Sequence, residues 1–229
     1  MKSHYKHIAN VFTYPKKGYA QKVLACHQYL QKHYPSAANT FSRFADYIKD
    51  KNDNQIEEVF GFTFHIQAIC YLDIGYVLFG EDYSRGEFLV NMKNEQAKIN
   101  HDCGEELADN LPHVLHLISV SQDKTFVREL VHFALIPAVQ KMLEEFESGR
   151  MTLRNKVIKK KQKAIIMENV VDGNIYQNAI QALLKLLKID FEDNNYENVA
   201  PHYSATPLGL ANSCGGGGCS FTTTKTIKK

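Results

Sequence analysis

Residues 62–90 read FTFHIQAICYLDIGYVLFGEDYSRGEFLV, and this stretch decides the fold class. Counting from Ile66, apolar side chains recur 3, 4, 8, 11 and 12 positions later, which is the spacing of one face of an α-helix. The opposite face is apolar too, so we predict a buried central helix over residues 66–79. Asp73 falls on the apolar stripe, where a carboxylate must be paired, protonated or directed into a groove. We favour a paired core carboxylate.

The acidic turn that follows is expected to connect this helix to a second one. Ser84 and Glu87 are three residues apart and precede an apolar run, which is the pattern of a capping box at a helix start. Asp82 is the alternative candidate for the N-cap. The next helix should therefore begin close to Ser84.

Three residues near this turn have a local structural interpretation beside a functional one. Arg85 could pair with Asp109, and Gly86 could permit close helix packing. Asp109 precedes Leu111 and Pro112, and a proline suits the first turn of a further helix, so Asp109 is a candidate N-cap. The same side chains could instead contact a partner.

Helical spacing recurs along the rest of the chain, whereas no run alternates with period two between Asn-Gly or Asp-Gly turns. Further helices are predicted at residues 20–33 and 37–49, from the Leu111-Pro112 pair onward, at residues 124–147 with a kink at Pro137, and at residues 175–187. The sequence thus predicts an all-α, single-domain helical bundle over residues 1–190 and a flexible Gly- and Thr-rich tail over residues 191–229.

Composition places the chain among globular proteins, with 44% hydrophobic and 23% charged residues. The longest nearly apolar stretch, residues 68–80, is interrupted by an aspartate and is too short to cross a hydrocarbon core of ~30 Å, so no membrane span is predicted. The N-terminal residues lack the apolar core of an export signal, and five irregularly spaced cysteines fit reduced thiols. We therefore expect a cytoplasmic protein.

Basic residues give little indication of a nucleic-acid partner. The net charge is +2, and 22 of the 27 basic residues are lysines, which suit a solvated surface more than planar recognition of phosphate. Residues 154–163, RNKVIKKKQK, hold six basic residues and no acidic one. This run is either an exposed connector or a patch for an acidic partner, and we favour the connector.

Histidines and cysteines provide the candidate for metal chemistry. His101 and Cys103, followed by His113 and His116, supply four possible zinc ligands, and histidines at i and i+3 share a helix face. The pattern matches no common zinc spacing, so a metal site is not predicted. The tail segment CGGGGC holds a cysteine pair that lacks the other two ligands of a closed site.

No motif of an enzyme is present in the sequence. It contains no phosphate-binding glycine loop, no G-x-S-x-G elbow and no H-E-x-x-H pair. We predict no catalytic residue, no cofactor and no enzyme activity. A metal- or redox-binding helical protein that uses the Cys/His residues and the CGGGGC tail is the alternative function.

Three separated segments share their order and character with one known family. They are residues 11–15 (VFTYP), residues 62–90 with their glycine-containing acidic turn and Arg-Gly pair, and residues 106–112 (ELADNLP). Together they resemble the nitrate reductase delta-subunit family, a group of TorD-like redox-enzyme maturation proteins. IYQNAIQALLKLL is similar to the last helix of that family, so the resemblance covers residues 8–188. Ala108, Asn110 and His65 depart from the usual family residues, which leaves the client open.

The resemblance implies an all-α chaperone for assembly of a nitrate-reductase-type molybdoenzyme. Its partner would be the N-terminal peptide of the catalytic molybdopterin subunit during insertion of the molybdenum cofactor, with the cofactor delivery machinery as a second candidate. A peptide in a helix-lined groove gains apolar burial and charge-assisted hydrogen bonds. The residues expected to contact the partner are Asp73, Tyr76, Glu81, Asp82, Tyr83, Arg85, Gly86, Asp109, Leu111 and Pro112.

Overall fold

The computed structural model describes residues 2–66, 68–146 and 175–192, and these residues confirm the all-α, single-domain prediction. They form helices and no strand, with one isolated antiparallel bridge between Asp73 and Asn110. The helices are α1 (Tyr5–Ala9), α2 (Tyr19–His33), α3 (Pro35–Lys49), α4 (Asp53–Phe64), α5 (Ile74–Phe79), α6 (Tyr83–Lys98), α7 (Leu111–Val120), α8 (Lys124–Leu130), η1 (Val131–Leu135), α9 (Ile136–Glu144) and α12 (Ile175–Asp190).

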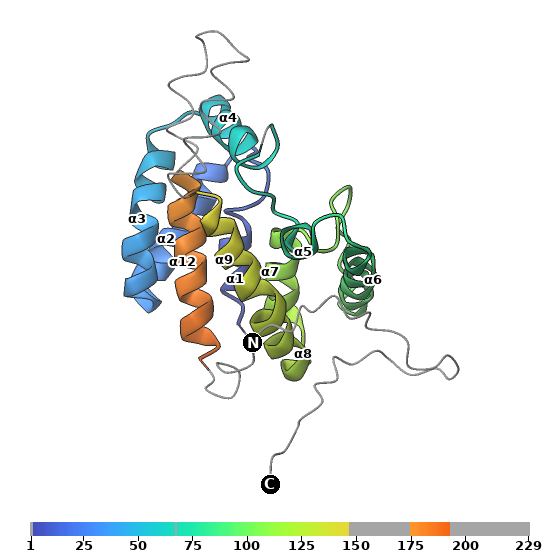
Figure 1. Cartoon of the computed structure of the whole chain (residues 1–229). Helices are drawn as coiled ribbons and strands as arrows, with labels where there is room; N and C mark the ends of the chain where they lie inside the picture. Colours follow the sequence, from blue (N-terminus) through green and yellow to red (C-terminus); the bar gives the residue numbers. More distant parts are fainter. Residues whose placement is uncertain (1, 67, 147–174, 193–229) are drawn as a thin grey trace, which may run out of the picture.

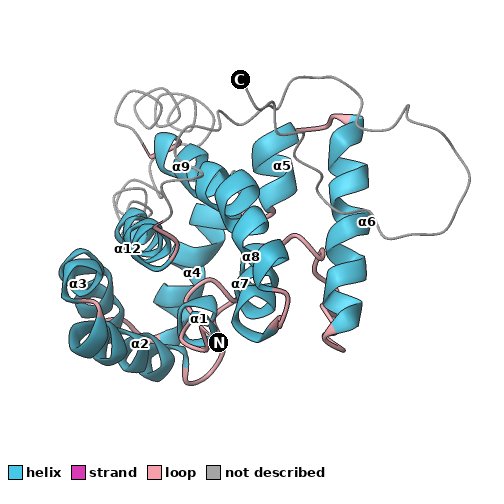
Figure 2. Ribbon diagram, turned by 90° about the horizontal axis from the view of Figure 1, so that it is seen from below, coloured by secondary structure: helices cyan, strands magenta, loops and turns pink. Residues whose placement is uncertain are grey.

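Helix α12 packs in the interior of the bundle. It lies between α3 and α9, and α2 packs against α3 (Figures 1 and 2). Half of its 16 residues are buried, including Tyr176 and Leu183. Helix α1 packs against α7 and α5 packs against α9, while α6 lies at the edge of the bundle beside α5 (Figure 2). The predicted last amphipathic helix is confirmed.

Polar contacts tie the first helix of the chain to the end of α12. His4 Nε2 lies 2.6 Å from Asp190 Oδ2, and the Tyr34 hydroxyl donates to Asp190 Oδ1 at 2.9 Å. Lys2 pairs with the same carboxylate. Burial favours the neutral acid, but hydrogen bonding and the charges of His4 and Lys2 prevail, so the pKa of Asp190 lies below its ordinary value.

The predicted central helix is wrong in its first half. Only Ile74–Phe79 is helical, and residues 68–73 are irregular. The apolar side chains of this irregular segment are nevertheless buried, namely Ala68, Ile69, Cys70 and Leu72. In this segment the apolar spacing therefore indicates which side chains are buried, but it does not indicate a helix. Asp73 lies at the N-cap position of α5 and not on a helical stripe.

Helix α6 begins with a different cap from the predicted capping box. Asp82 is the N-cap, and its Oδ1 accepts hydrogen bonds from the Ser84 N–H at 2.8 Å and from the Ser84 hydroxyl at 2.6 Å. The Ser84–Glu87 box is therefore wrong, and the Asp82 alternative is confirmed. A carboxylate at this position also interacts favourably with the positive end of the helix dipole.

Pro137 divides the long helix that was predicted to end near residue 147. The chain runs continuously from α8 through η1 to α9, and η1 is a five-residue π-helical turn that ends two residues before the proline. A proline lacks the N–H that would bond to the preceding turn, and its ring collides with the carbonyl four residues earlier. The wider π-helical turn accommodates this, so the predicted irregularity takes the form of η1.

Helices α1 and α4 are not predicted from the sequence. Helix α4 starts with a capping box in which the Asn52 side chain accepts from the Gln55 N–H at 3.0 Å and the Gln55 side chain accepts from the Asn52 N–H at 3.1 Å. In the described ranges, no helix combines the length and the apolar character needed to cross a membrane. The basic run and almost all of the predicted tail lie outside the described residues.

Candidate functional site

The candidate site is a groove of about 530 Å³ where the start of α2, the end of α4 and the loops before α5 and α7 meet. Its lining includes Phe12, Thr13, Tyr14, Lys16, Lys22, Phe60, Phe64, His65, Tyr71, Leu72, Asp73, Glu106, Asn110 and Pro112. Each of the segments 11–15, 62–90 and 106–112 contributes to this lining. Three stretches far apart in the sequence therefore meet at one groove.

Hydrogen bonds join two of the groove walls. The Leu111 N–H donates to the Leu72 carbonyl at 2.9 Å, and Asn110 Nδ2 donates to Asp73 Oδ1 at 3.0 Å. Asp73 is thus paired, as favoured from the sequence, but it lies at the groove with 26% of its side chain exposed rather than in the core. This bridge fixes the loop before α5 to the loop before α7.

Arg85 reaches the groove wall from α6. Its guanidinium lies 3.8 Å from Asp73 Oδ2 and sits over the Tyr76 ring, 5.0 Å from the ring centroid. Tyr76 packs edge-on against Tyr71, with centroids 4.6 Å apart. The predicted pairing of Arg85 with Asp109 is wrong, because Asp73 is the carboxylate that Arg85 contacts. These side chains form a continuous row from α6 to the groove.

Asp109 caps a helix other than the one predicted. It is fully buried, and its Oδ2 accepts a hydrogen bond at 2.9 Å from the Gly75 N–H in the first turn of α5. The predicted N-cap role on α7 is wrong, because Asn110 occupies that position. Asp109 Oδ1 has no hydrogen-bond partner among the described residues. Burial and then the neighbouring charge of Asp73 raise the pKa of Asp109 to about 6.

Replacing Asp109 by asparagine is expected to change the pH dependence of stability. An acid whose folded-state pKa is raised to about 6 contributes stability below its unfolded pKa, and this stability is lost as the pH rises through about 6. Relative to Asp109→Asn, the wild type should lose about 2 kcal/mol of unfolding free energy between about pH 4 and about pH 7. Urea denaturation over this range measures the difference, and parallel profiles would contradict it.

Asp109→Ala is the matched comparison, since it removes the acceptor for the Gly75 N–H as well as the charge. A buried donor without a partner costs about 1–3 kcal/mol. The alanine variant should therefore be less stable than Asp109→Asn across the whole pH range.

Eight of the ten predicted contact residues do not line the groove, and only Asp73 and Pro112 of that set do. Glu81, Asp82 and Tyr83 are exposed at the start of α6. Gly86 is exposed as well, and a Cβ added there would meet nothing within 4 Å, so the close packing predicted for it is wrong. Leu111 is fully buried in the core. The four exposed residues therefore face solvent outside the groove, and Leu111 contributes to the core.

Two exposed aromatic side chains in the groove were not singled out from the sequence. Tyr14 is 49% exposed and Tyr71 is 46% exposed. The Tyr14 ring packs edge-on against the buried ring of Phe60, with centroids 5.6 Å apart, and this contact holds it in position. Tyr14 stands in the VFTYP segment, but only the fold brings it into the same groove lining as Tyr71.

The basic and the acidic side chains of the groove lining come from different segments of the chain. Lys16 and Lys22 come from the segment around the start of α2, whereas Asp73 and Glu106 come from the loops before α5 and α7. Both lysines and Glu106 are exposed. The groove lining therefore includes both cationic and anionic side chains beside its aromatic residues.

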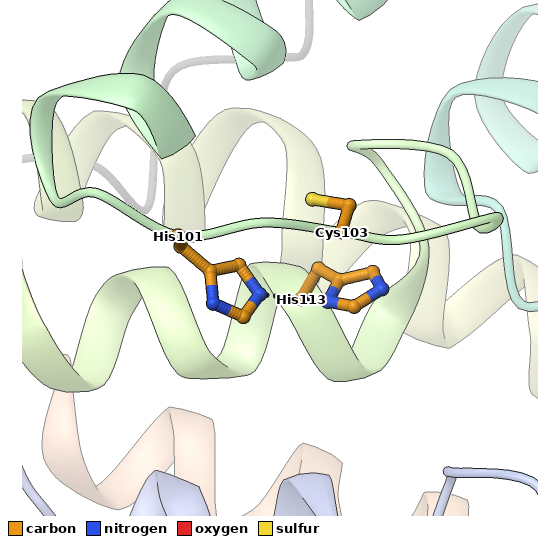
Figure 3. Close-up of side chains that lie close together, drawn as sticks. All are labelled: His101, Cys103 and His113. Carbon is orange, nitrogen blue, oxygen red and sulfur yellow. Dashed lines mark hydrogen bonds between the residues drawn. The ribbon is translucent and has the colours of Figure 1, made fainter.

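A second group of polar side chains lies where the loop after α6 meets α7. His101, Cys103 and His113 each offer one potential ligand atom, and these atoms lie within 4.8 Å of one another (Figure 3). His101 Nε2 is 2.9 Å from His113 Nδ1. Burial lowers the pKa of both imidazoles and raises the pKa of the Cys103 thiol. The fold thus brings together three of the four candidate ligands, and His116 lies beside the group.

No protein-family model and no curated protein matches the chain. The resemblance to the nitrate reductase delta-subunit family therefore stays an expectation based on the residues of the three segments.

Proposed function

We propose that the chain is a TorD-like assembly chaperone for a nitrate-reductase-type molybdoenzyme, and that its groove binds the N-terminal segment of the catalytic subunit during cofactor insertion. One observation carries the proposal: residues 11–15, 62–90 and 106–112, chosen on sequence grounds, all contribute to the lining of one groove. Segments that form one binding surface are expected to meet in this way.

The groove chemistry suits a peptide with both apolar and charged residues. Tyr14 and Tyr71 offer half-exposed rings on which apolar anchors of a peptide can be buried. Lys16 and Lys22 can bind carboxylates of the peptide, and Glu106 can bind its basic residues.

Release of the client is as necessary to this function as binding. The two aromatic anchors are already partly covered in the free protein, so each gains only part of its area on binding. Association also costs translational and side-chain freedom. The affinity is therefore moderate. In this role the protein acts in the cytoplasm, holds no cofactor of its own and performs no catalytic step.

Co-expression tests the proposal. The full-length tagged chain should retain the catalytic subunit of its client through affinity purification, and should lose it when the N-terminal segment of that subunit is deleted. Because the sequence is compatible with several client enzymes, the molybdopterin catalytic subunits of the host are co-expressed with the chain one at a time. Recovery of none of them, or recovery that does not depend on the N-terminal segment, would contradict the proposal.

A further inference from the structure

The loop between α6 and α7 carries a group of side chains outside the groove lining. Asn100 reverses the chain after α6 with a φ of 52°. The loop then places His101 and Cys103 beside His113 in the first turn of α7 (Figure 3). One atom from each side chain, two nitrogens and one sulfur, falls within 4.8 Å of the others. These atoms are the usual protein ligands of zinc.

Gln96 holds this arrangement in place. It is buried, and its side-chain Nε2 donates to the His113 carbonyl at 3.1 Å and to the Ala108 carbonyl at 3.3 Å. Its own carbonyl accepts from the His101 N–H at 3.0 Å. One residue of α6 therefore fixes the backbone on both sides of the cluster, so the three side chains start from anchored positions.

We infer that His101, Cys103 and His113 form a three-ligand site for a zinc-class transition metal ion, with its fourth coordination position open. Bond lengths of about 2.0 Å to nitrogen and about 2.3 Å to sulfur hold tetrahedral ligand atoms about 3.3–3.6 Å apart. The observed 2.9 Å between the two imidazole nitrogens is close to this separation. Small side-chain movements therefore suffice to admit the ion.

The donor set selects the class of metal. Two imidazoles and one thiolate favour zinc and similar borderline-soft ions over magnesium or calcium, which prefer oxygen ligands. Three protein ligands with one open position are also the pattern of zinc sites that bind a further molecule.

His116 is the nearest further donor. Its ring centroid is 4.3 Å from that of His101, yet it does not belong to the group of mutually close ligand atoms. All three side chains of the site are partly exposed, which leaves the open position accessible to water or to a donor from another molecule.

The alternative to a metal site is a structural role, in which the cluster is a hydrogen bond between two imidazoles. That bond alone would hold the loop against α7 without any ion. It predicts no metal affinity and no role for the Cys103 sulfur. Cys103 therefore separates the two explanations.

Cobalt titration of the full-length protein tests the site. All variants carry Cys214→Ser and Cys219→Ser, so that the tail thiols do not contribute a signal. This background protein should bind one Co²⁺ per chain and show a thiolate-to-cobalt charge-transfer band with tetrahedral visible bands. Cys103→Ser should lose the charge-transfer band. His113→Gln should lower the affinity for Zn²⁺, measured in competition with a chelator, by at least about tenfold.

His33→Gln, which removes an exposed histidine from α2, is the matched control and should bind both metals like the background protein. Circular dichroism of the metal-free variants verifies that each is folded. Absence of a stoichiometric site in the background protein, or an unchanged charge-transfer band in Cys103→Ser, would overturn the inference. Neither result depends on whether the groove binds a client peptide.

Discussion

Replacing Tyr14 and Tyr71 together by alanine is expected to weaken binding of the client's N-terminal peptide by roughly 100-fold. Both rings line the groove, and each is about half exposed and so available to a peptide. Truncation of a central aromatic contact typically costs about 1–2 kcal/mol or more. Two such losses amount to about 3 kcal/mol, and every 1.4 kcal/mol is about tenfold in affinity. Fluorescence anisotropy with a labelled peptide measures the change.

Tyr83→Ala is the matched control for this experiment. Tyr83 is 83% exposed at the start of α6 and is not among the residues that line the groove. Its substitution deletes the same atoms from the surface and should leave the affinity unchanged. Equal losses in the control and in the double variant would show that the peptide does not use the groove, as would an unchanged affinity in the double variant.

Gly75→Ala is expected to destabilise the protein by about 2–4 kcal/mol. A Cβ at this position would lie 2.6 Å from Asp109 Oδ2 and 2.9 Å from Phe88 Cδ1. The Asp109 carboxylate cannot retreat without losing its hydrogen bond to the Gly75 N–H, and Phe88 is itself buried. Overpacking and a lost buried hydrogen bond each cost about 1–3 kcal/mol. Chemical denaturation of the variant measures the loss.

Gly86→Ala provides the opposite expectation at a nearby glycine. Gly86 lies within α6, and an added Cβ would meet nothing within 4 Å. Alanine is favoured over glycine in a helix by about 0.5–1 kcal/mol, so this variant should be slightly more stable than the wild type. If the two alanine variants had equal stability, the close approach of Gly75 to Asp109 would be contradicted.

The all-α class could be read from the sequence because most helices carry an apolar stripe of their own. The prediction failed at residues 68–73, where an irregular segment buries Ala68, Ile69, Cys70 and Leu72 and reproduces helical spacing. It also missed α4, although the Asn52–Gln55 capping box at its start is a signal that the sequence does contain. Local pattern thus predicts burial more reliably than it predicts the element.

The sequence singled out three segments by resemblance, but it did not predict that they meet at one groove. Most of the residues expected to contact a partner do not line that groove, and residue pairing between the segments depends on the bridge between Asp73 and Asn110. That bridge brings Asp73 to Arg85 and turns Asp109 into the core toward Gly75. No spacing rule in the sequence encodes a contact across more than thirty residues.

The His101, Cys103 and His113 cluster illustrates the same limit. Zinc motifs are recognised by short fixed spacings, whereas this group depends on a reversal at Asn100 and on the side chain of Gln96. The sequence supplied the candidate ligands, and the loop geometry decided which of them meet.

The molybdenum content of the client enzyme tests the central claim most directly. The client is purified from cells that lack this chain, from cells that carry the wild type, and from cells that carry the Tyr14→Ala/Tyr71→Ala variant. If the groove holds the catalytic subunit during cofactor insertion, the wild type restores molybdenum to the client and the double variant does not. A client that is fully loaded with molybdenum in the absence of the chain would contradict the assembly role.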